Sequence, residues 1–140
     1  MTTKKEIDQY CDVIRQTAYE LYRYLGSGHL EKIYENGLIH RLSKKGFSIQ
    51  QQFPISVHDE DGTIIGDLKA DLMINDILLI ECKAVEQTLP VHTAQILGYL
   101  RATKLEYGLL INFGGARFYI KRYAYTRKNH SLDPCFRTGL

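Results

Sequence analysis

Apolar residues recur every three to four positions along the N-terminal third of the chain, a spacing that predicts two amphipathic helices. The first helix is expected between Thr3 and Gly26, because Thr3 followed by Glu6 is a capping-box pattern and glycine commonly ends helices. The second helix is expected to begin after Gly28 and to stop at Gly46. Its predicted buried face consists of Leu30, Ile33, Tyr34, Leu38 and Leu42.

The middle of the chain changes to the two-residue alternation of β-strands. One strand is predicted over residues 47–57, edged or interrupted by Pro54, and the sheet continues from residue 63 after a turn at 58–62. From Leu68 to Ile74 every second residue is apolar, so one face of the predicted strand is apolar. The other face carries Asp67, Lys69, Asp71 and Met73. Residues 77–80 are apolar on both faces, which predicts a central strand.

A third helix is predicted from Thr88 or Pro90 to about Thr103, with Ala94, Leu97 and Leu100 on one side. Two further strands are predicted over residues 107–113 and 117–123. The order ααβββαββ indicates an α/β domain with a mixed central sheet flanked by helices. We assign residues 1–125 to this domain and residues 126–140 to a polar C-terminal tail.

The composition, 44% hydrophobic and 24% charged over 140 residues, is that of one ordinary globular domain. A net charge of +2 neither requires nor excludes a nucleic-acid partner. The absence of a membrane-length apolar run or an apolar secretory core predicts a cytoplasmic protein with no membrane partner. Cys11, Cys82 and Cys135 lack the spacing of a disulfide framework or a zinc site, and the first two are interpreted as buried hydrophobic positions.

Candidate chemistry is concentrated on the predicted central strand and its neighbour. Glu81 and Lys83 are two residues apart and therefore share one face of their strand. A two-residue turn at Asn75–Asp76 would send Asp71 and Glu81 to opposite faces, whereas a three-residue connection or a bulge would pair them directly. We predict the second arrangement.

Two paired carboxylates are suited to Mg²⁺ or Mn²⁺, hard ions that prefer oxygen ligands and keep several waters. Such an ion polarises a scissile phosphate and lowers the pKa of a bound water. Lys83 is then expected to orient that water or to offset charge on the transition state. The alternative is an ordinary Asp–Lys or Glu–Lys pair across two strands.

Further candidates lie on the predicted helices. Glu31 falls in a first helical turn, where a carboxylate is favourable in any helix. His92, Gln95 and Tyr99 share one stripe, and His92 is interpreted as structural. Gln95 is expected to bind a metal-linked water or a phosphate, and Tyr99 to pack against Lys83 or a nucleotide. The alternative is a helix surface with one partly buried tyrosine.

Several of these segments together resemble the small GxxExxY proteins, a group of the PD-(D/E)XK nuclease superfamily. The resemblance covers roughly residues 5 to 123 and lies in the segments Gly28–Asn36, Ala70–Asp71, Ile80–Lys83, His92–Leu100 and Leu109–Phe113. The Gln95…Tyr99 element is similar to that of RecB-type members. Ala70 stands where the superfamily motif has proline.

The resemblance implies a restriction-endonuclease-like core with a metal site. Asp71 and Glu81 would be metal ligands, Lys83 the catalytic lysine, and Glu31 an acidic residue reaching the site from a helix. Gln95 and Tyr99 would support the site from the next helix.

The leading hypothesis is therefore a Mg²⁺-dependent or Mn²⁺-dependent nuclease that hydrolyses phosphodiester bonds, with DNA as the expected substrate. A homodimer mate or a partner protein is expected to assist so small a chain. The alternatives are a non-catalytic module on the same fold that binds nucleic acid or protein, and a structural subunit whose carboxylates only form ion pairs.

Overall fold

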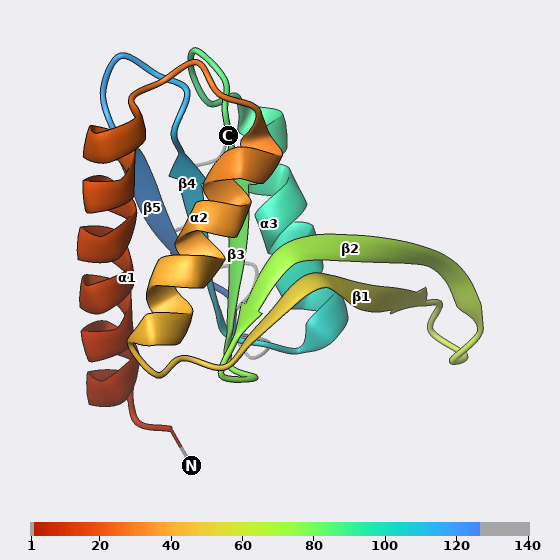
Figure 1. The fold of residues 1–140 in the computed structure, drawn as a ribbon. Helices are drawn as coiled ribbons and strands as arrows, with labels where there is room; N and C mark the ends of the chain where they lie inside the picture. Colours follow the sequence, from red (N-terminus) through yellow and green to blue (C-terminus); the bar gives the residue numbers. More distant parts are fainter. Residues whose placement is uncertain (1, 127–140) are drawn as a thin grey trace.

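A five-stranded mixed sheet forms the centre of the molecule, with strands in the order β1-β2-β3-β4-β5 (Figure 1). The computed structural model describes residues 2–126. Strands β3 and β4 are parallel, and the other neighbouring strands are antiparallel. The elements are α1 (Lys4–Leu25), α2 (Glu31–Lys44), β1 (Ile49–His58), β2 (Ile64–Ile74), β3 (Leu78–Lys83), α3 (Pro90–Thr103), β4 (Tyr107–Asn112) and β5 (Tyr119–Ala124). The predicted element order and the central position of β3 are confirmed.

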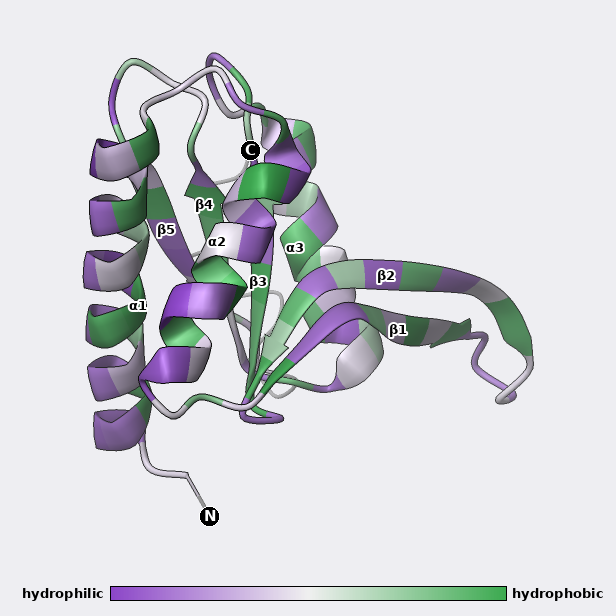
Figure 2. Cartoon of the chain, in the orientation of Figure 1, coloured by the Kyte–Doolittle hydropathy of each residue, from purple (hydrophilic) through white to green (hydrophobic). Residues whose placement is uncertain are grey.

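Helices cover both faces of the sheet, because its central strands are apolar on both sides (Figure 2). On β3, Leu78, Ile80 and Cys82 pack with α1 and α2, whereas Leu79 packs with α3. The two faces thus hold separate cores. The predicted polar tail lies outside the described residues except for residue 126, as does Cys135. No helix within residues 2–126 is long and apolar enough to span a membrane.

Helix α1 follows the sequence prediction closely. The Thr3 hydroxyl accepts a hydrogen bond from the backbone N–H of Glu6 at 3.1 Å, and Gly26 follows the last turn. Helix α2 packs tightly against α1 at Gly37, where an added Cβ would lie 2.9 Å from a methyl group of Leu21. A larger residue at position 37 would therefore push the two helices apart.

Three predicted helical positions were wrong. Leu30 is exposed because it precedes the first residue of α2. Ile33 is exposed because the buried face of α2 includes the charged residue Glu35 beside the predicted positions Tyr34, Leu38 and Leu42. On α3, Ala94 is exposed and Ile96 takes the buried position. Apolar spacing did not exclude these positions, because it fixes neither the residue at which a helix begins nor which edge of its apolar stripe faces solvent.

Strands β1 and β2 extend beyond the body of the molecule as a two-stranded arm (Figure 1). Strand β2 pairs with β3 only at residues 72–74, although its pairing with β1 continues to Ile64. On the arm Ile64, Ile65 and Leu68 are all exposed. Pro54 lies in β1, the edge strand, where a missing N–H is tolerated as the sequence predicted.

Because side chains are buried in the body and exposed on the arm, shortening a side chain should change the free energy of unfolding very differently in the two parts. Ile80→Ala should lower the free energy of unfolding by about 2–5 kcal/mol, because this side chain is fully buried beneath α1 and α2. Ile65→Ala should change it by no more than about 0.5 kcal/mol, because Ile65 is 64% exposed. Urea denaturation of both variants measures the contrast. Equal losses would contradict the separation of arm and core.

Candidate functional site: the divergence of β2 and β3

The candidate site lies where β2 separates from β3. The ladder between β2 and β3 runs from Ile74 opposite Leu78, next to the turn, to Leu72 opposite Ile80. Three residues therefore connect Ile74 to Leu78. This is the three-residue connection that the sequence analysis favoured, and in the same register Asp71 lies opposite Glu81. Asn75 and Asp76 both adopt left-handed backbone conformations in this turn, with φ of 51° and 60°.

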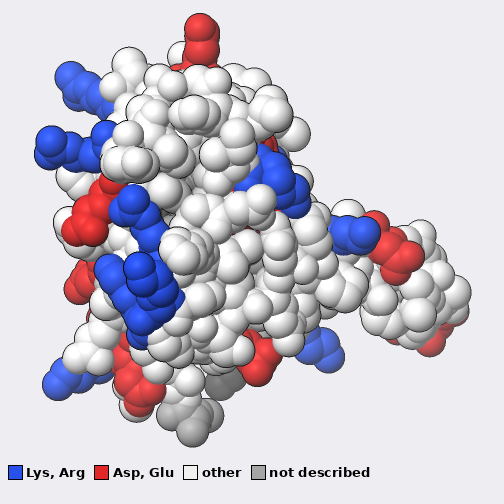
Figure 3. Space-filling view, viewed as in Figure 1, with Lys and Arg blue, Asp and Glu red and all other residues white. Residues whose placement is uncertain are grey.

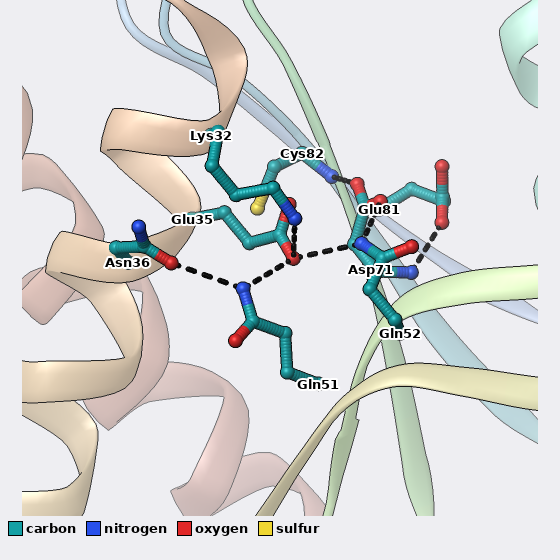
Figure 4. Close-up of polar contacts among 8 residues, drawn as sticks. All are labelled: Lys32, Glu35, Asn36, Gln51, Gln52, Asp71, Glu81 and Cys82. Atoms are coloured by element: carbon teal, nitrogen blue, oxygen red, sulfur yellow. Dashed lines mark hydrogen bonds and ion pairs between the residues drawn. The ribbon is translucent and has the colours of Figure 1, made fainter.

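Beyond the ladder, the two carboxylates take over the hydrogen bonding of the backbone (Figure 4). The N–H of Asp71 donates to Oε1 of Glu81 at 2.8 Å, and the N–H of Cys82 donates to Oδ2 of Asp71 at 2.8 Å. One oxygen of each carboxylate is therefore used to hold the strands together. Asp71 Oδ1 and Glu81 Oε2 are left for other partners. Lys83 Nζ lies 3.6 Å from Glu81 Oε2.

Burial, and after it the closeness of other acids, raises the pKa of both carboxyl groups. Burial, then the neighbouring Asp71, raises the pKa of Glu81 to about 8, although Lys83 opposes the shift. Burial also raises the pKa of Asp71, with a smaller contribution from Glu35. The ammonium group of Lys83 does not offset this burial of negative charge. A site of this kind gains from a further cation.

Glu31 begins α2 and faces the same acids. Burial, followed by the charge of Asp71, raises the pKa of Glu31. Its place is fixed by Tyr34, whose hydroxyl donates to the carbonyl of Gly26 at 2.5 Å and accepts from the N–H of His29 at 3.2 Å. The Tyr34 ring stacks on Phe113 with centroids 4.7 Å apart. Tyr34 therefore ties the connection between the helices to the core.

On α3, Gln95 donates through Nε2 to the hydroxyl of Tyr99 at 2.8 Å. Burial, then the charge of Glu81, raises the pKa of Tyr99 to about 12, so this phenol remains protonated at neutral pH. His92 Nδ1 accepts the N–H of Leu89 at 3.1 Å and caps the helix, which confirms its structural interpretation.

Three polar residues around the site were not among the residues predicted from the sequence. Glu35 on α2 is 2% exposed and is contacted by side chains of β1, including Gln52. Asn112, at the end of β4, bonds the N–H and the carbonyl of Val85 at 3.0 and 2.9 Å and so fixes the chain just after Lys83. Glu35 and Leu38 are three residues apart on one helical face, a signal that was available. Nothing in the local sequence indicated Gln52.

The donor set suits a hard cation only in part. Asp71 and Glu81 offer the oxygens that Mg²⁺ and Mn²⁺ prefer, and such ions commonly use one or two carboxylates plus water and phosphate. Within residues 2–126, however, no three His, Cys, Asp or Glu side chains are grouped closely enough to hold a metal together. Glu31 contributes charge from nearby but is not brought into a three-residue ligand set with the other two.

A family model described as the PD-(D/E)XK nuclease superfamily matches residues 8–123, which include every site residue described above. The chain belongs to the PD-(D/E)XK nuclease superfamily. Its element order and five-stranded mixed sheet are the restriction-endonuclease-like fold of this superfamily.

One solved structure shares the fold, and a second is a weaker match. The crystal structure of SSO0001 has a TM-score of 0.55 and 21% identity to this PD-(D/E)XK protein, over 65% of this chain and 48% of that one. This chain thus spans about half the length of that protein. An alkaline exonuclease from Laribacter hongkongensis matches with a TM-score of 0.46 and 11% identity, over 99% of this chain and 78% of that one. No protein of curated function matches the chain.

The raised pKa of Glu81 predicts that the free energy of unfolding of the metal-free protein contains a contribution from Glu81 that falls as pH rises. Below the ordinary value of 4.5, Glu81 is protonated in both the folded and unfolded states, so it carries no penalty. Between 4.5 and about 8 the unfolded state ionises first, and the folded state loses relative stability. Glu81→Gln should therefore gain stability relative to wild type between pH 5 and pH 8.

Urea denaturation in EDTA at several pH values measures this gain. Glu86→Gln, at an exposed position shortly after β3, is the matched control and should follow wild type. A Glu81→Gln difference that is constant across the range would contradict the raised pKa.

Proposed function

We propose that this protein is a nuclease that hydrolyses phosphodiester bonds with Mg²⁺ or Mn²⁺, and that DNA is its substrate. The observation that carries the proposal is the meeting of Asp71, Glu81 and Lys83 where β2 leaves β3, with one oxygen of each carboxylate not needed by the backbone. The segment from Gly28 to Tyr34 further supports assignment to the GxxExxY group.

In this proposal Asp71 Oδ1 and Glu81 Oε2 hold the cation, and Glu31 adds negative charge from α2. The bound cation would supply a water of lowered pKa and polarise the scissile phosphate. Lys83, whose side chain is 15% exposed, is placed to hold a phosphate oxygen or the attacking water with its ammonium group. Tyr99, hydrogen-bonded to Gln95, presents a neutral hydroxyl to the same region.

The charge on the surface suggests how a nucleic acid would approach. Lys and Arg gather over the end of α2 beside α1 (Figure 3). A groove of about 470 Å³ there is lined by Thr17, Glu20, His40, Arg41, Lys44 and Lys45. The turn at the end of the arm contains three consecutive acids, at positions 59–61, which disfavour phosphate. We infer that the nucleic acid backbone contacts the α2 side rather than the end of the arm.

Cleavage assays with matched variants test the proposed activity. Purified protein should hydrolyse single-stranded, double-stranded or branched DNA in Mg²⁺ or Mn²⁺ and not in EDTA. Asp71→Asn and Lys83→Met should each lower the rate by about 100-fold or more, because the first weakens a ligand of the cation and the second removes the ammonium group placed at the phosphate. Asp67→Asn and Lys69→Met, exposed positions of β2, should remain active.

Folding of all four variants is checked by circular dichroism. Absence of metal-dependent hydrolysis of all these substrates by the wild type would refute the nuclease assignment.

Binding measurements test the direction of approach. Replacing both Arg41 and Lys44 by Ala should weaken DNA binding at all sequences and reduce the slope of log affinity against log salt by about 1–2. Replacing the exposed pair Lys4 and Lys5, at the start of α1, is the control. Fluorescence anisotropy across a salt series provides the slopes. Equal effects of the two pairs would contradict the assigned surface.

The second candidate function is a non-catalytic module that binds nucleic acid on the same fold. It is favoured by the absence of a ready three-residue ligand set in the described part of the chain. Such a module would show salt-sensitive binding without turnover, and Lys83→Ala would leave that binding unchanged.

A further inference from the structure

Gln52 has an unusual backbone at the candidate site. It lies in β1, opposite Asp71, between the ladder pairs Gln51–Leu72 and Phe53–Ala70. Its φ is 54°, which lies in the left-handed region that residues other than glycine and asparagine rarely adopt. A strained residue beside a candidate site points to a role there, because nothing in a regular strand requires that conformation.

The left-handed backbone changes where the side chain points. Consecutive residues of a regular strand face opposite sides, yet Gln51 and Gln52 both reach Oε1 of Glu35 (Figure 4). The distances from their Nε2 atoms to that oxygen are 3.0 and 2.9 Å. Lys32 Nζ lies 3.4 Å from the same oxygen. The buried carboxylate of Glu35 is thereby compensated and held in place.

Gln52 differs from Gln51 in its second contact. Its Nε2 lies 3.5 Å from Asp71 Oδ1, the oxygen that the backbone leaves available, whereas Gln51 Nε2 lies 3.0 Å from Oδ1 of Asn36. An amide Nε2 has two hydrogens, so Gln52 donates to Glu35 with one and points the other at Asp71. Asp71 Oδ2 is already bonded to the N–H of Cys82. Both oxygens of Asp71 thus have a defined partner.

We propose that Gln52, anchored on Glu35, is a positioning residue that holds Asp71 Oδ1 in the orientation needed to bind a divalent cation. The inference rests on the proposed function, because it assumes that Asp71 is a metal ligand. Groups that hydrogen-bond a ligating carboxylate typically contribute about 10–100-fold to metal affinity. Gln52 acts through Asp71 and does not touch the substrate.

Gln52→Gly separates positioning from folding. Glycine adopts the left-handed backbone without strain, and Glu35 keeps Gln51 and Lys32 as partners, so the melting temperature should stay within about 3 °C of wild type. Titration calorimetry of the metal-free full chain with Mn²⁺ should nevertheless show affinity weaker by about 10–100-fold. Raising the Mn²⁺ concentration should restore kcat, because only the occupancy of the cation site is lowered.

Gln51→Ala is the matched control. This variant loses the neighbouring amide and its hydrogen bond to the same Glu35 oxygen, but it loses no contact with Asp71. Its Mn²⁺ affinity should therefore stay within about 3-fold of wild type. Glu35→Gln keeps an oxygen that can accept from Gln52 and should therefore lose less affinity than Gln52→Gly. A larger loss in Glu35→Gln would overturn the anchoring role of Glu35.

The outcomes separate this inference from the proposed function. Wild-type binding of Mn²⁺ with unchanged affinity in Gln52→Gly would overturn the positioning role alone, whether or not the melting temperature falls. Failure of the wild type to bind Mn²⁺ would overturn both proposals. Weaker binding in Gln52→Gly, with intact folding and recovery of kcat at high Mn²⁺, would support the inference.

Discussion

The separation of β2 from β3 is the constraint on which the rest of this structure depends. Two strands that diverge inside a protein leave backbone N–H groups without their ladder partners, and a buried unpaired N–H is costly. Here the carboxylates of Asp71 and Glu81 accept those hydrogen bonds, each from the opposite strand. The same two side chains therefore stabilise the divergence and remain as an acidic pair at its centre.

This arrangement has an electrostatic consequence. Buried acids close to one another disfavour the ionised form, and the pKa values of Glu31, Asp71 and Glu81 are all raised. Uncharged residues at these positions would give a more stable protein. The unfavourable charge is understandable in a PD-(D/E)XK fold, because a cation at this place would neutralise it.

The divergence also determines the shape of the molecule. Freed from β3, the first half of β2 pairs only with β1 and forms an arm with both sides exposed. The base of the arm adjoins the site, since Gln52 and Asp71 lie opposite each other where β1 and β2 leave the body. The left-handed backbone of Gln52 lets both glutamines contact α2 through Glu35, so the arm and the helix meet at the acidic pair.

The sequence by itself determined the element order, the central position of β3 and the shared face of Glu81 and Lys83, because apolar periodicity and strand alternation are local properties. It also narrowed the connection between β2 and β3 to two geometries. Only the tertiary structure decided that Glu35 meets the two glutamines of β1 and that Gln52 reaches Asp71. Those contacts join α2, β1 and β2, and a positive φ in mid-strand is imposed by surrounding packing rather than by any pattern along the chain.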